Sequence, residues 1–243
     1  QYELFLKYDN FNEKEYSILY EHCKQNQIDF ISTPFDHFSV EFLDNYLPFY
    51  KISSSDITNI PLLELISTKN KPIILSTGAS SIEEIDFALK KMENAGAKEI
   101  ALLHCILNYP TLYENANLQM IKYMRNYYQK RLIGYSDHTL PDKSMSVLTT
   151  AYLMGAVIIE KHFTDSNFRN GPDHKFSLNP DTWKKMVEDT RILESSMGDG
   201  IKKIELNEKE SSIIQRRGVW LNKNVFPNEK FSENHIDILR PCP

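Results

Sequence analysis

Arg131-Leu-Ile-Gly-Tyr-Ser-Asp-His138-Thr139 is the stretch that decides the fold, because the apolar run that follows Arg131 becomes polar near its end. A buried strand has this pattern where it emerges from the core. A second stretch, Ala156-Val-Ile-Ile-Glu-Lys-His162-Phe-Thr164, repeats the pattern and also carries a histidine near its end. Two strand ends that each carry an imidazole are able to converge on one metal ion.

Similar apolar runs precede these two at regular spacing, and helical patterns lie between most of them. We expect strands at 28–32, 49–53, 72–76, 100–105, 132–136 and 156–161. We expect helices at 13–26, 82–95, 116–128, 143–154 and 180–197, with a shorter link near 40–46. Units of roughly 20 to 30 residues are typical of repeated βα modules, whose strands form a parallel sheet.

Each run ends on residues that are able to do chemistry, so polar groups are distributed along one edge of the predicted sheet. In a (β/α) barrel the functional groups lie at the carboxyl ends of the strands. An open doubly wound sheet would concentrate them at one switch point, usually after a glycine-rich first turn, which this sequence lacks. We therefore predict a TIM-type (β/α)8 barrel in the α/β class. Six units are visible, and we expect the first two upstream of Gln1.

The composition changes after the last predicted helix of the barrel. Residues 1–197 are predicted to form the partial barrel, and the Gly- and Lys/Glu-rich residues 198–215 a linker. Residues 216–243 contain a strand-like Gly-Val-Trp-Leu run and a turn at Asn228. We interpret them as the start of a second, small β-rich domain that is not completed.

The bulk composition excludes several kinds of partner. The net charge of -5 and the scattered basic residues argue against nucleic acid. No apolar run approaches the length that crosses a bilayer, so no membrane partner is expected. Three cysteines without metal-like spacing predict reduced thiols and a cytoplasmic protein.

The two histidines have neighbours on the same strand face, because side chains alternate across a strand. Ser136 shares a face with His138, and Glu160 shares one with His162. If both faces point into the barrel mouth, the imidazoles meet at a cation and leave other positions to water and substrate. The ligand type suits Mn²⁺, Mg²⁺, Fe²⁺ or Zn²⁺ without separating them. The alternative is that each histidine is a satisfied core or rim residue; the repeated context favours the metal.

Hydroxyl groups and one ammonium gather at neighbouring strand ends. They belong to Thr33, Lys51, Ser54, Ser76 and Ser136. Such groups, near loop amides, are able to hold a phosphate or a carboxylate without a P-loop. Small hydroxyl residues also cap βα turns, and the residues alone leave both interpretations open.

Two loops carry weaker signals. Asp173 follows a rigid Gly-Pro turn and either faces a substrate or lies in an exposed turn, which the residues alone favour. Tyr109 follows the fourth predicted strand and either contacts a sugar or packs against its neighbours. Cys105 is expected to be a small buried apolar residue.

Taken in this order, the runs closely resemble the sialic acid synthase family, the phosphoenolpyruvate-condensing synthases that make N-acetylneuraminate and related nonulosonates. The motifs are Phe30-Ile-Ser-Thr-Pro-Phe-Asp36, Tyr50-Lys-Ile-Ser-Ser54, Pro72-Ile-Ile-Leu-Ser-Thr-Gly78, Leu103-His-Cys105 with Tyr109-Pro-Thr111, Gly134-Tyr-Ser-Asp-His-Thr139, Glu160-Lys-His-Phe-Thr-Asp165 and Gly171-Pro-Asp173. The tail from Arg216 resembles the start of the antifreeze-like (SAF) domain that follows the barrel in this family.

The resemblance implies a (β/α)8 barrel and a divalent metal, usually Mn²⁺ or Mg²⁺, held by the catalytic residues His138 and His162. It implies that phosphoenolpyruvate is held by Thr33, Lys51, Ser54, Ser76 and Ser136. It places Asp56, as a further catalytic residue, near the acceptor sugar together with Tyr109 and Asp173. A homodimer is implied as well, because the antifreeze-like domain of the family reaches the partner subunit's site.

The implied reaction condenses phosphoenolpyruvate with an open-chain N-acetylated aminosugar such as N-acetylmannosamine. The metal polarises the aldehyde as a Lewis acid, and the enol carbon of phosphoenolpyruvate attacks it. Water captures the resulting cationic centre, and phosphate leaves by C–O cleavage. Much of the catalysis would be positioning and charge stabilisation.

Several departures from the family pattern bear on activity. Leu107 stands where members usually have Ser or Asn in contact with the phosphoenolpyruvate carboxylate, so either Asn108 substitutes or affinity falls; Ser55 replaces a common Gly. An acidic catalytic residue and a substrate-binding lysine belong to the units expected upstream, so we expect this chain to be incomplete for activity. Two alternatives stay open: a related phosphoenolpyruvate-dependent synthase with another sugar acceptor, and an inactive fragment that acts only as a binding module.

Overall fold

The computed structural model describes residues 11–142 and 144–242. The chain divides between Leu193 and Glu194 into two compact units, and each is described by itself. The helix α8 (Pro180–Ser196) spans the division.

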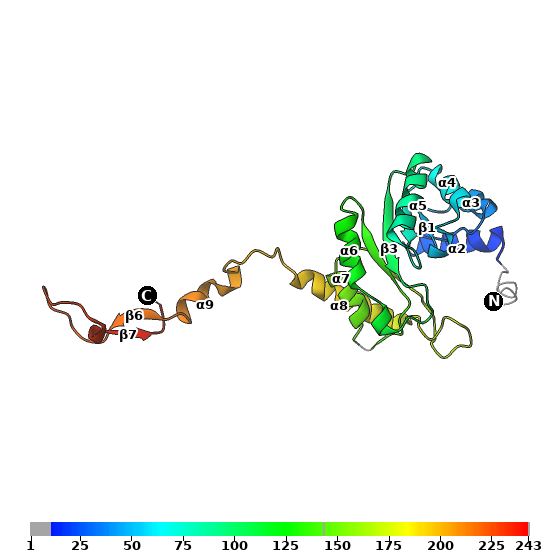
Figure 1. Ribbon diagram of the computed structural model, residues 1–243. Coiled ribbons are helices and arrows are strands. Elements are labelled where there is room, and N and C mark those ends of the chain that lie inside the picture. The colour runs from blue at the N-terminus through cyan, green and yellow to red at the C-terminus, as the bar shows by residue number, and fades with distance from the viewer. Residues whose placement is uncertain (1–10, 143, 243) are drawn as a thin grey trace. The chain divides into compact units, whose positions relative to one another are not determined.

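The first unit is built on a parallel five-stranded sheet in the order β1-β2-β3-β4-β5 (Figure 1). Its strands are β1 (Tyr50–Ile52), β2 (Ile73–Ser76), β3 (Ile100–Cys105), β4 (Ile133–Asp137) and β5 (Ile159–Lys161). Its other helices are α2 (Glu13–Gln25), α3 (His37–Leu43), α4 (Ile60–Ser67), α5 (Ile82–Asn94), α6 (Gln119–Tyr127) and α7 (Ser146–Leu153). Helices connect consecutive parallel strands, as βα repeats require. The predicted α/β class is confirmed.

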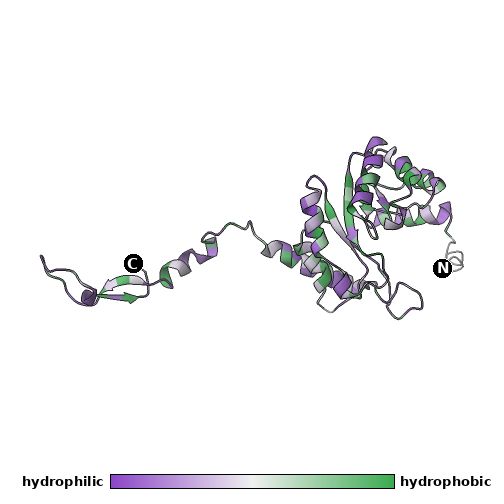
Figure 2. Ribbon diagram, viewed as in Figure 1, coloured by the Kyte–Doolittle hydropathy of each residue, from purple (hydrophilic) through white to green (hydrophobic). Residues whose placement is uncertain are grey.

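Apolar burial and helix capping explain why these segments fold as they do. All six residues of β3 are buried, and hydrophobic colour marks much of the strands in Figure 2. In α5, Ile85, Leu89 and Met92 are buried at helical spacing, and each such side chain contributes roughly 1.5–3 kcal/mol. Ser81 and Glu84 close a capping box at the start of this helix. Among the described residues, no helix combines the length and apolarity that crossing a membrane requires.

The predicted strand at 28–32 is wrong, since the structure assigns no strand there. The apolar run is not buried: Ile28 is 63% exposed and Ile31 is 38% exposed. Phe30 packs instead against the ring of Tyr16 at 6.2 Å between centroids. A run of β-branched residues forms a strand only where a neighbour supplies hydrogen bonds and its side chains are covered.

The helix α4, which connects β1 to β2, was not predicted from the sequence. Pro61 lies in its first turn, where the missing amide is tolerated. Leu62, Leu63 and Ile66 are all fully buried. A helix buried this completely has a nearly continuous apolar run, so the helical period is hard to see in its sequence.

The second unit contains a short helix and a two-stranded antiparallel sheet. The helix α9 (Lys209–Ile214) lies within the predicted linker. The strands β6 (Gly218–Leu221) and β7 (Ile236–Leu239) pair from Gly218 opposite Leu239 to Leu221 opposite Ile236. Asn228 has a φ of 72° in the connection between them, where a turn was predicted.

Candidate active site

A pocket of about 420 Å³ lies where the strands of the parallel sheet end. Its lining residues are Thr33, Phe35, Lys51, Ser53, Ser54, Ser76, Cys105, Tyr109, Ser136, His138, Glu160, Lys161 and His162. All the site residues predicted from the sequence, except Asp56 and Asp173, border this pocket. The parallel sheet brings them together because every strand presents its carboxyl end at the same edge.

The two histidines face each other, with ring centroids 5.4 Å apart and an angle of 76° between the ring planes. The His138 Nδ1 lies 2.8 Å from the carbonyl oxygen of Ile106, which only accepts hydrogen bonds, so Nδ1 carries the proton. The His162 Nδ1 lies 3.4 Å from Asp173 Oδ2. Both rings thus engage Nδ1 with an oxygen and leave Nε2 to other partners, as ligating histidines commonly do.

The electrostatic environment keeps both imidazoles neutral. Burial lowers the pKa of His138, and the neighbouring His162 lowers it further. Burial also lowers the pKa of His162, with Lys161 adding to the effect and Asp173 opposing it. A neutral imidazole is the form that binds a metal ion.

His138 and His162 together offer a metal ion two nitrogen ligands. Across residues 11–142 and 144–242, no three His, Cys, Asp or Glu side chains are placed to hold a metal ion together. Two neutral imidazoles suit Mn²⁺, Mg²⁺, Fe²⁺ or Zn²⁺ when water or substrate oxygens complete the coordination. Metal binding by His138 and His162 stays a prediction.

Ser76 carries the clearest sign of a ligand in this pocket. Its Oγ is buried and has no hydrogen-bond partner among the described residues. Leaving a buried hydroxyl unsatisfied costs about 1–3 kcal/mol, so such a group needs an explanation. Nearby, Gly78 has no room for a side chain: a Cβ would lie 2.8 Å from Cys105 Sγ and 3.1 Å from Ser54 Oγ.

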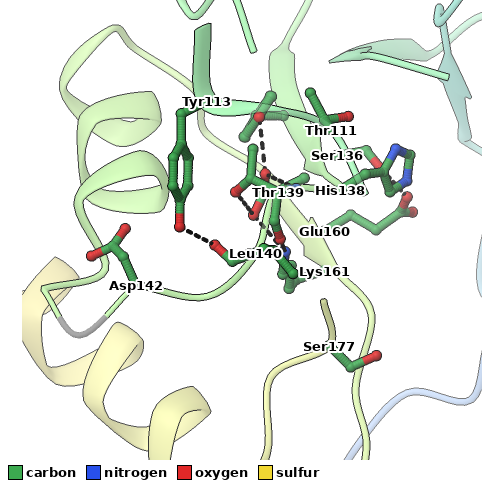
Figure 3. A network of polar contacts seen from close by, with 12 residues as sticks. Thr111, Tyr113, Ser136, His138, Thr139, Leu140, Asp142, Glu160, Lys161 and Ser177 are labelled. Carbon is green, nitrogen blue, oxygen red and sulfur yellow. Dashed lines mark hydrogen bonds and ion pairs between the residues drawn. The ribbon is translucent and has the colours of Figure 1, made fainter. Parts of the chain in front are cut away.

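Glu160 joins Lys51 to Ser136 across the pocket. No role was predicted for it from the sequence. Ser136 Oγ donates to Glu160 Oε1 at 2.6 Å (Figure 3), and Lys51 Nζ lies 3.5 Å from Glu160 Oε2. Lys51 also donates to the carbonyl of Ile52 at 3.0 Å. The alternation of Glu160 with His162 along one strand was the signal that could have identified it.

Aromatic rings form one wall beside the histidines. The Tyr109 ring centroid lies 4.2 Å from that of His138 and 5.9 Å from that of His162. Phe176, which is 1% exposed, lies 4.8 Å from His162 by the same measure. Burial raises the pKa of the Tyr109 hydroxyl, so it stays protonated as a donor. Phe176 belongs to an irregular segment after β5, where no periodic pattern could have predicted it.

Asp56 and Leu107 lie outside the pocket lining, whereas Cys105 belongs to it. Asp56 belongs to a short 3₁₀ turn, accepts from Asn59 Nδ2 at 3.1 Å and is not among the residues that line the pocket. The Leu107 side chain is 41% exposed and is not part of the lining. Cys105 is 4% exposed, which confirms its predicted burial, and burial raises the pKa of its thiol.

A parallel βα sheet that gathers two lysines, several hydroxyls and two neutral imidazoles at its carboxyl edge has the character of an enzyme. The family model described as the NeuB family matches residues 1–202, and the chain belongs to this family. The family predicted from the sequence is thereby confirmed.

Several of the relatives are synthases of legionaminic, pseudaminic or N-acetylneuraminic acids or their phosphates. Over 232 residues the chain is 39% identical to the N,N'-diacetyllegionaminic acid synthase of Campylobacter jejuni, covering 94% of this chain and 68% of that protein. Over 182 residues it is 35% identical to the N-acetylneuraminate-9-phosphate synthase of Drosophila melanogaster, covering 74% and 48% respectively. The crystal structure of the N-acetylneuraminic acid (sialic acid) synthetase of Leptospira borgpetersenii, in complex with citrate, matches with a TM-score of 0.76 and 34% identity. That match covers 83% of this chain and 69% of the Leptospira chain.

Proposed function

We propose that this protein condenses phosphoenolpyruvate with an open-chain N-acetylated aminosugar to give a sialic or related nonulosonic acid and phosphate. The unsatisfied, buried hydroxyl of Ser76 is the observation that carries the proposal. It lies in one pocket with a lysine and two neutral imidazoles, in a chain whose relatives are nonulosonic acid synthases.

Phosphoenolpyruvate would occupy the part of the pocket that Lys51 and Ser76 border. Hydroxyl groups donate to phosphate or carboxylate oxygens, and the ammonium supplies a charge-assisted bond. The proposed ligands are Thr33, Lys51, Ser54, Ser76 and Ser136. Glu160 would have to share Lys51 with the incoming anion, because its carboxylate lies 3.5 Å from the ammonium.

His138 and His162 would hold the divalent metal, Mn²⁺ or Mg²⁺, through their Nε2 atoms. When bound, the metal supplies Lewis-acid polarisation of the aldehyde. The chain's own contribution is the orientation of the imidazoles, since Ile106 and Asp173 bond to their Nδ1 atoms. Aromatic side chains beside them exclude water, which strengthens every polar contact in the site.

The proposed reaction forms one carbon–carbon bond and breaks one carbon–oxygen bond. The enol carbon of phosphoenolpyruvate attacks the aldehyde carbon, and the aldehyde oxygen becomes a hydroxyl after it takes up a proton. Water adds to the cationic carbon and loses one proton, which balances the proton taken up by the aldehyde oxygen. Inorganic phosphate then leaves with the electrons of the C–O bond and takes up the second proton of that water, and the ketone remains. The bound groups act mainly by holding the reactants at reacting distance.

The acceptor would lie beside Tyr109 and Asp173, with Asp56 farther along the rim. An acceptor without a phosphate suits the described pocket better than a sugar phosphate does. The ammonium groups that border the pocket belong to Lys51 and Lys161, and Lys161 is already paired with Asp137. In the loop after β5, Arg169 is paired with Asp165 at 3.0 Å.

The finer predictions about architecture belong to the same proposal. The five strands would be part of a closed (β/α)8 barrel, and residues 216–243 would begin an antifreeze-like domain in a homodimer. The two antiparallel strands of the second unit support the latter. A cytoplasmic location is proposed because the three cysteines are all free thiols.

The test is phosphate release from phosphoenolpyruvate by the full-length protein with Mn²⁺ and N-acetylmannosamine or a related N-acetylated hexosamine. We expect release that depends on both the sugar and the metal, and that falls strongly in the Ser76→Ala variant. No release with any such acceptor, from a protein that still binds phosphoenolpyruvate, would favour the binding module. No binding of phosphoenolpyruvate would contradict the proposal.

A further inference from the structure

Asp137 and Lys161 form an ion pair that no step of the proposed reaction uses, although each directly precedes one of the two histidines. Lys161 Nζ lies 2.7 Å from Asp137 Oδ2, and the side chains are 0% and 2% exposed. Removing two charges from water is costly even when they pair, so a pair this deeply buried needs a structural reason.

The pair lies on the side of the sheet opposite the pocket contacts. In the parallel ladder of β4 and β5, Ser136 is opposite Glu160, and Asp137 is opposite Lys161. Side chains alternate, so the first two meet at the pocket and the second two meet behind it. The ion pair borders a small space beside Met145, at the start of α7. Lys161 borders the pocket as well, but its ammonium is bonded on the Asp137 side.

Asp137 organises its own strand end through four accepted hydrogen bonds. Tyr135 donates its hydroxyl at 3.0 Å, and Lys161 donates at 2.7 Å. Thr139 donates both its amide, at 3.0 Å, and its hydroxyl, at 3.1 Å. These contacts come from residues on both sides of His138, so the carboxylate holds the backbone from which that imidazole projects.

Lys161 connects this strand end to the neighbouring one. Its ammonium donates to the carbonyl of Thr139 as well as to Asp137, and Figure 3 shows it against the Thr139 segment. The residue that precedes His162 is thereby bonded to the residues before and after His138. The ladder of β4 and β5 ends at Asp137 and Lys161, so this link lies at the last paired residues before the two histidines.

We propose that Asp137 and Lys161 are positioning residues that set the separation of the His138 and His162 rings. The inference rests on the proposed function, which gives the two imidazoles a cation to hold. Neither residue touches a reactant in this account. They act through the adjacent histidines, in the way that outer contacts orient metal ligands.

The test compares variants that break the cross-strand link with one that does not. Lys161→Met and the double variant with Asp137→Asn break it, and Asp137→Asn alone removes the charge from its acceptor, whereas Tyr135→Phe removes one bond to the same carboxylate within β4. Mn²⁺ titration of the full-length protein should show about 10- to 100-fold weaker binding in the first three. The double variant should bind Mn²⁺ no more weakly than either single variant, because both substitutions act on the same link. Tyr135→Phe should bind close to the wild-type affinity.

A second readout needs no metal. In protein with labelled histidines, nuclear Overhauser contacts between the His138 ring and the rings of Tyr109 and His162 report the spacing, with centroids 4.2 Å and 5.4 Å away. We expect the contact between the histidines to weaken in the cross-strand variants and to persist in Tyr135→Phe. If wild-type protein binds no Mn²⁺, the proposed function fails, while these contacts still test the positioning role.

Unfolding curves separate positioning from a general loss of stability. Leu62→Ala in α4, which removes a fully buried side chain far along the chain from the pair, provides a destabilised control whose Mn²⁺ affinity should not change. Folded Lys161→Met and double variants with wild-type affinity and unchanged ring contacts would overturn the proposal. A double variant that fails to fold, when Tyr135→Phe folds, would also overturn it, because the pair would then support the fold itself.

Discussion

The two ends of the five-stranded sheet carry hollows of similar size and different chemistry. The hollow at the carboxyl ends measures about 420 Å³ and that at the amino ends about 490 Å³. The amino-end hollow is lined by Phe49, Pro72, Ile73, Ile74, Lys98, Glu99, Ile100, Ala101, Lys130, Arg131, Leu132 and Ile158. These are mostly apolar residues at or next to the strand starts, with charged residues from the preceding turns.

The difference shows that the volume of a hollow does not identify a functional site. At the carboxyl end, the Ser76 hydroxyl has no hydrogen-bond partner among the described residues, and two imidazoles face each other with their Nδ1 atoms next to oxygens. At the amino end, the charge of Arg131 is already paired with Glu93. Strand starts are apolar because they enter the core, and strand ends are polar because they leave it at the face where βα loops gather. Predictions about function therefore concern the carboxyl end, and matched changes at the amino end serve as controls.

The largest effect is expected from His138→Ala. The variant removes one of two proposed metal ligands, so metal-dependent phosphate release should fall below detection. Glu99→Gln, at the amino end, should retain wild-type turnover. Steady-state assays with and without added Mn²⁺ provide the measurement. Unchanged turnover in His138→Ala would remove this residue from the mechanism.

A smaller but specific effect is expected from Lys51→Met, which keeps most of the side-chain volume and removes the charge. Bonds to charged groups are worth about 1.5–3 kcal/mol, so the KM for phosphoenolpyruvate should rise roughly 10- to 100-fold. The KM for the aminosugar should change much less. Lys98→Met makes the same substitution at the other end and should leave both constants unchanged. Equal effects of the two substitutions on the KM for phosphoenolpyruvate would contradict the functional distinction between the two ends of the sheet.

A modest gain is expected from Leu107→Asn. The Leu107 amide lies close to Gly78, which follows β2, at 3.3 Å from the position of a Cβ there. A polar side chain at this loop position would add one hydrogen bond to the phosphoenolpyruvate carboxylate, worth about 0.5–1.5 kcal/mol. The KM for phosphoenolpyruvate should fall by a few-fold. A KM that stays constant or rises would show that Asn108 or another group already fills this role.

The smallest effect is expected from Asp142→Asn, in the loop that follows β4, and it concerns the stability of the fold at low pH. Partial burial raises the pKa of Asp142, but hydrogen bonds from Ser144 and Ser146 outweigh it and lower the pKa to about 2. The unfolded chain titrates near 3.9, so this carboxylate stabilises the fold above about pH 4 and loses its contribution as pH falls toward 2. In urea unfolding, Asp142→Asn should be less stable than wild type at pH 5, by ~1 kcal/mol or less, and nearly equal at pH 2. A difference that does not vary with pH would contradict this assignment.

The sequence predicted the carboxyl end of the sheet better than its surroundings. Strand ends such as Ser136 and His138 are readable because burial and alternation leave a local pattern, and the positions of β2 to β5 follow closely from it. The wrong strand at 28–32 and the missed helix α4 both come from short apolar runs, in which pairing and burial are decided by distant residues.

The site was only partly predictable from the sequence, because the positions of some of its side chains are also decided by distant residues. Phe176 and Asp173 reach the histidines from an irregular segment, and no periodicity specifies where such a segment turns. Asp173 was predicted near the acceptor and contacts His162, whereas Asp56 was predicted there and bonds to Asn59 outside the pocket lining. The buried pair of Asp137 and Lys161 becomes visible only with the strand register.

The central claim is that the carboxyl-end pocket binds the metal and phosphoenolpyruvate together. Crystals of the full-length protein grown with Mn²⁺ and phosphoenolpyruvate, measured at the manganese absorption edge, test it most directly. We predict an anomalous peak within bonding distance of the Nε2 atoms of His138 and His162, and phosphoenolpyruvate within hydrogen-bond distance of Lys51 and Ser76. A peak elsewhere, or phosphoenolpyruvate in the amino-end hollow, would contradict the account.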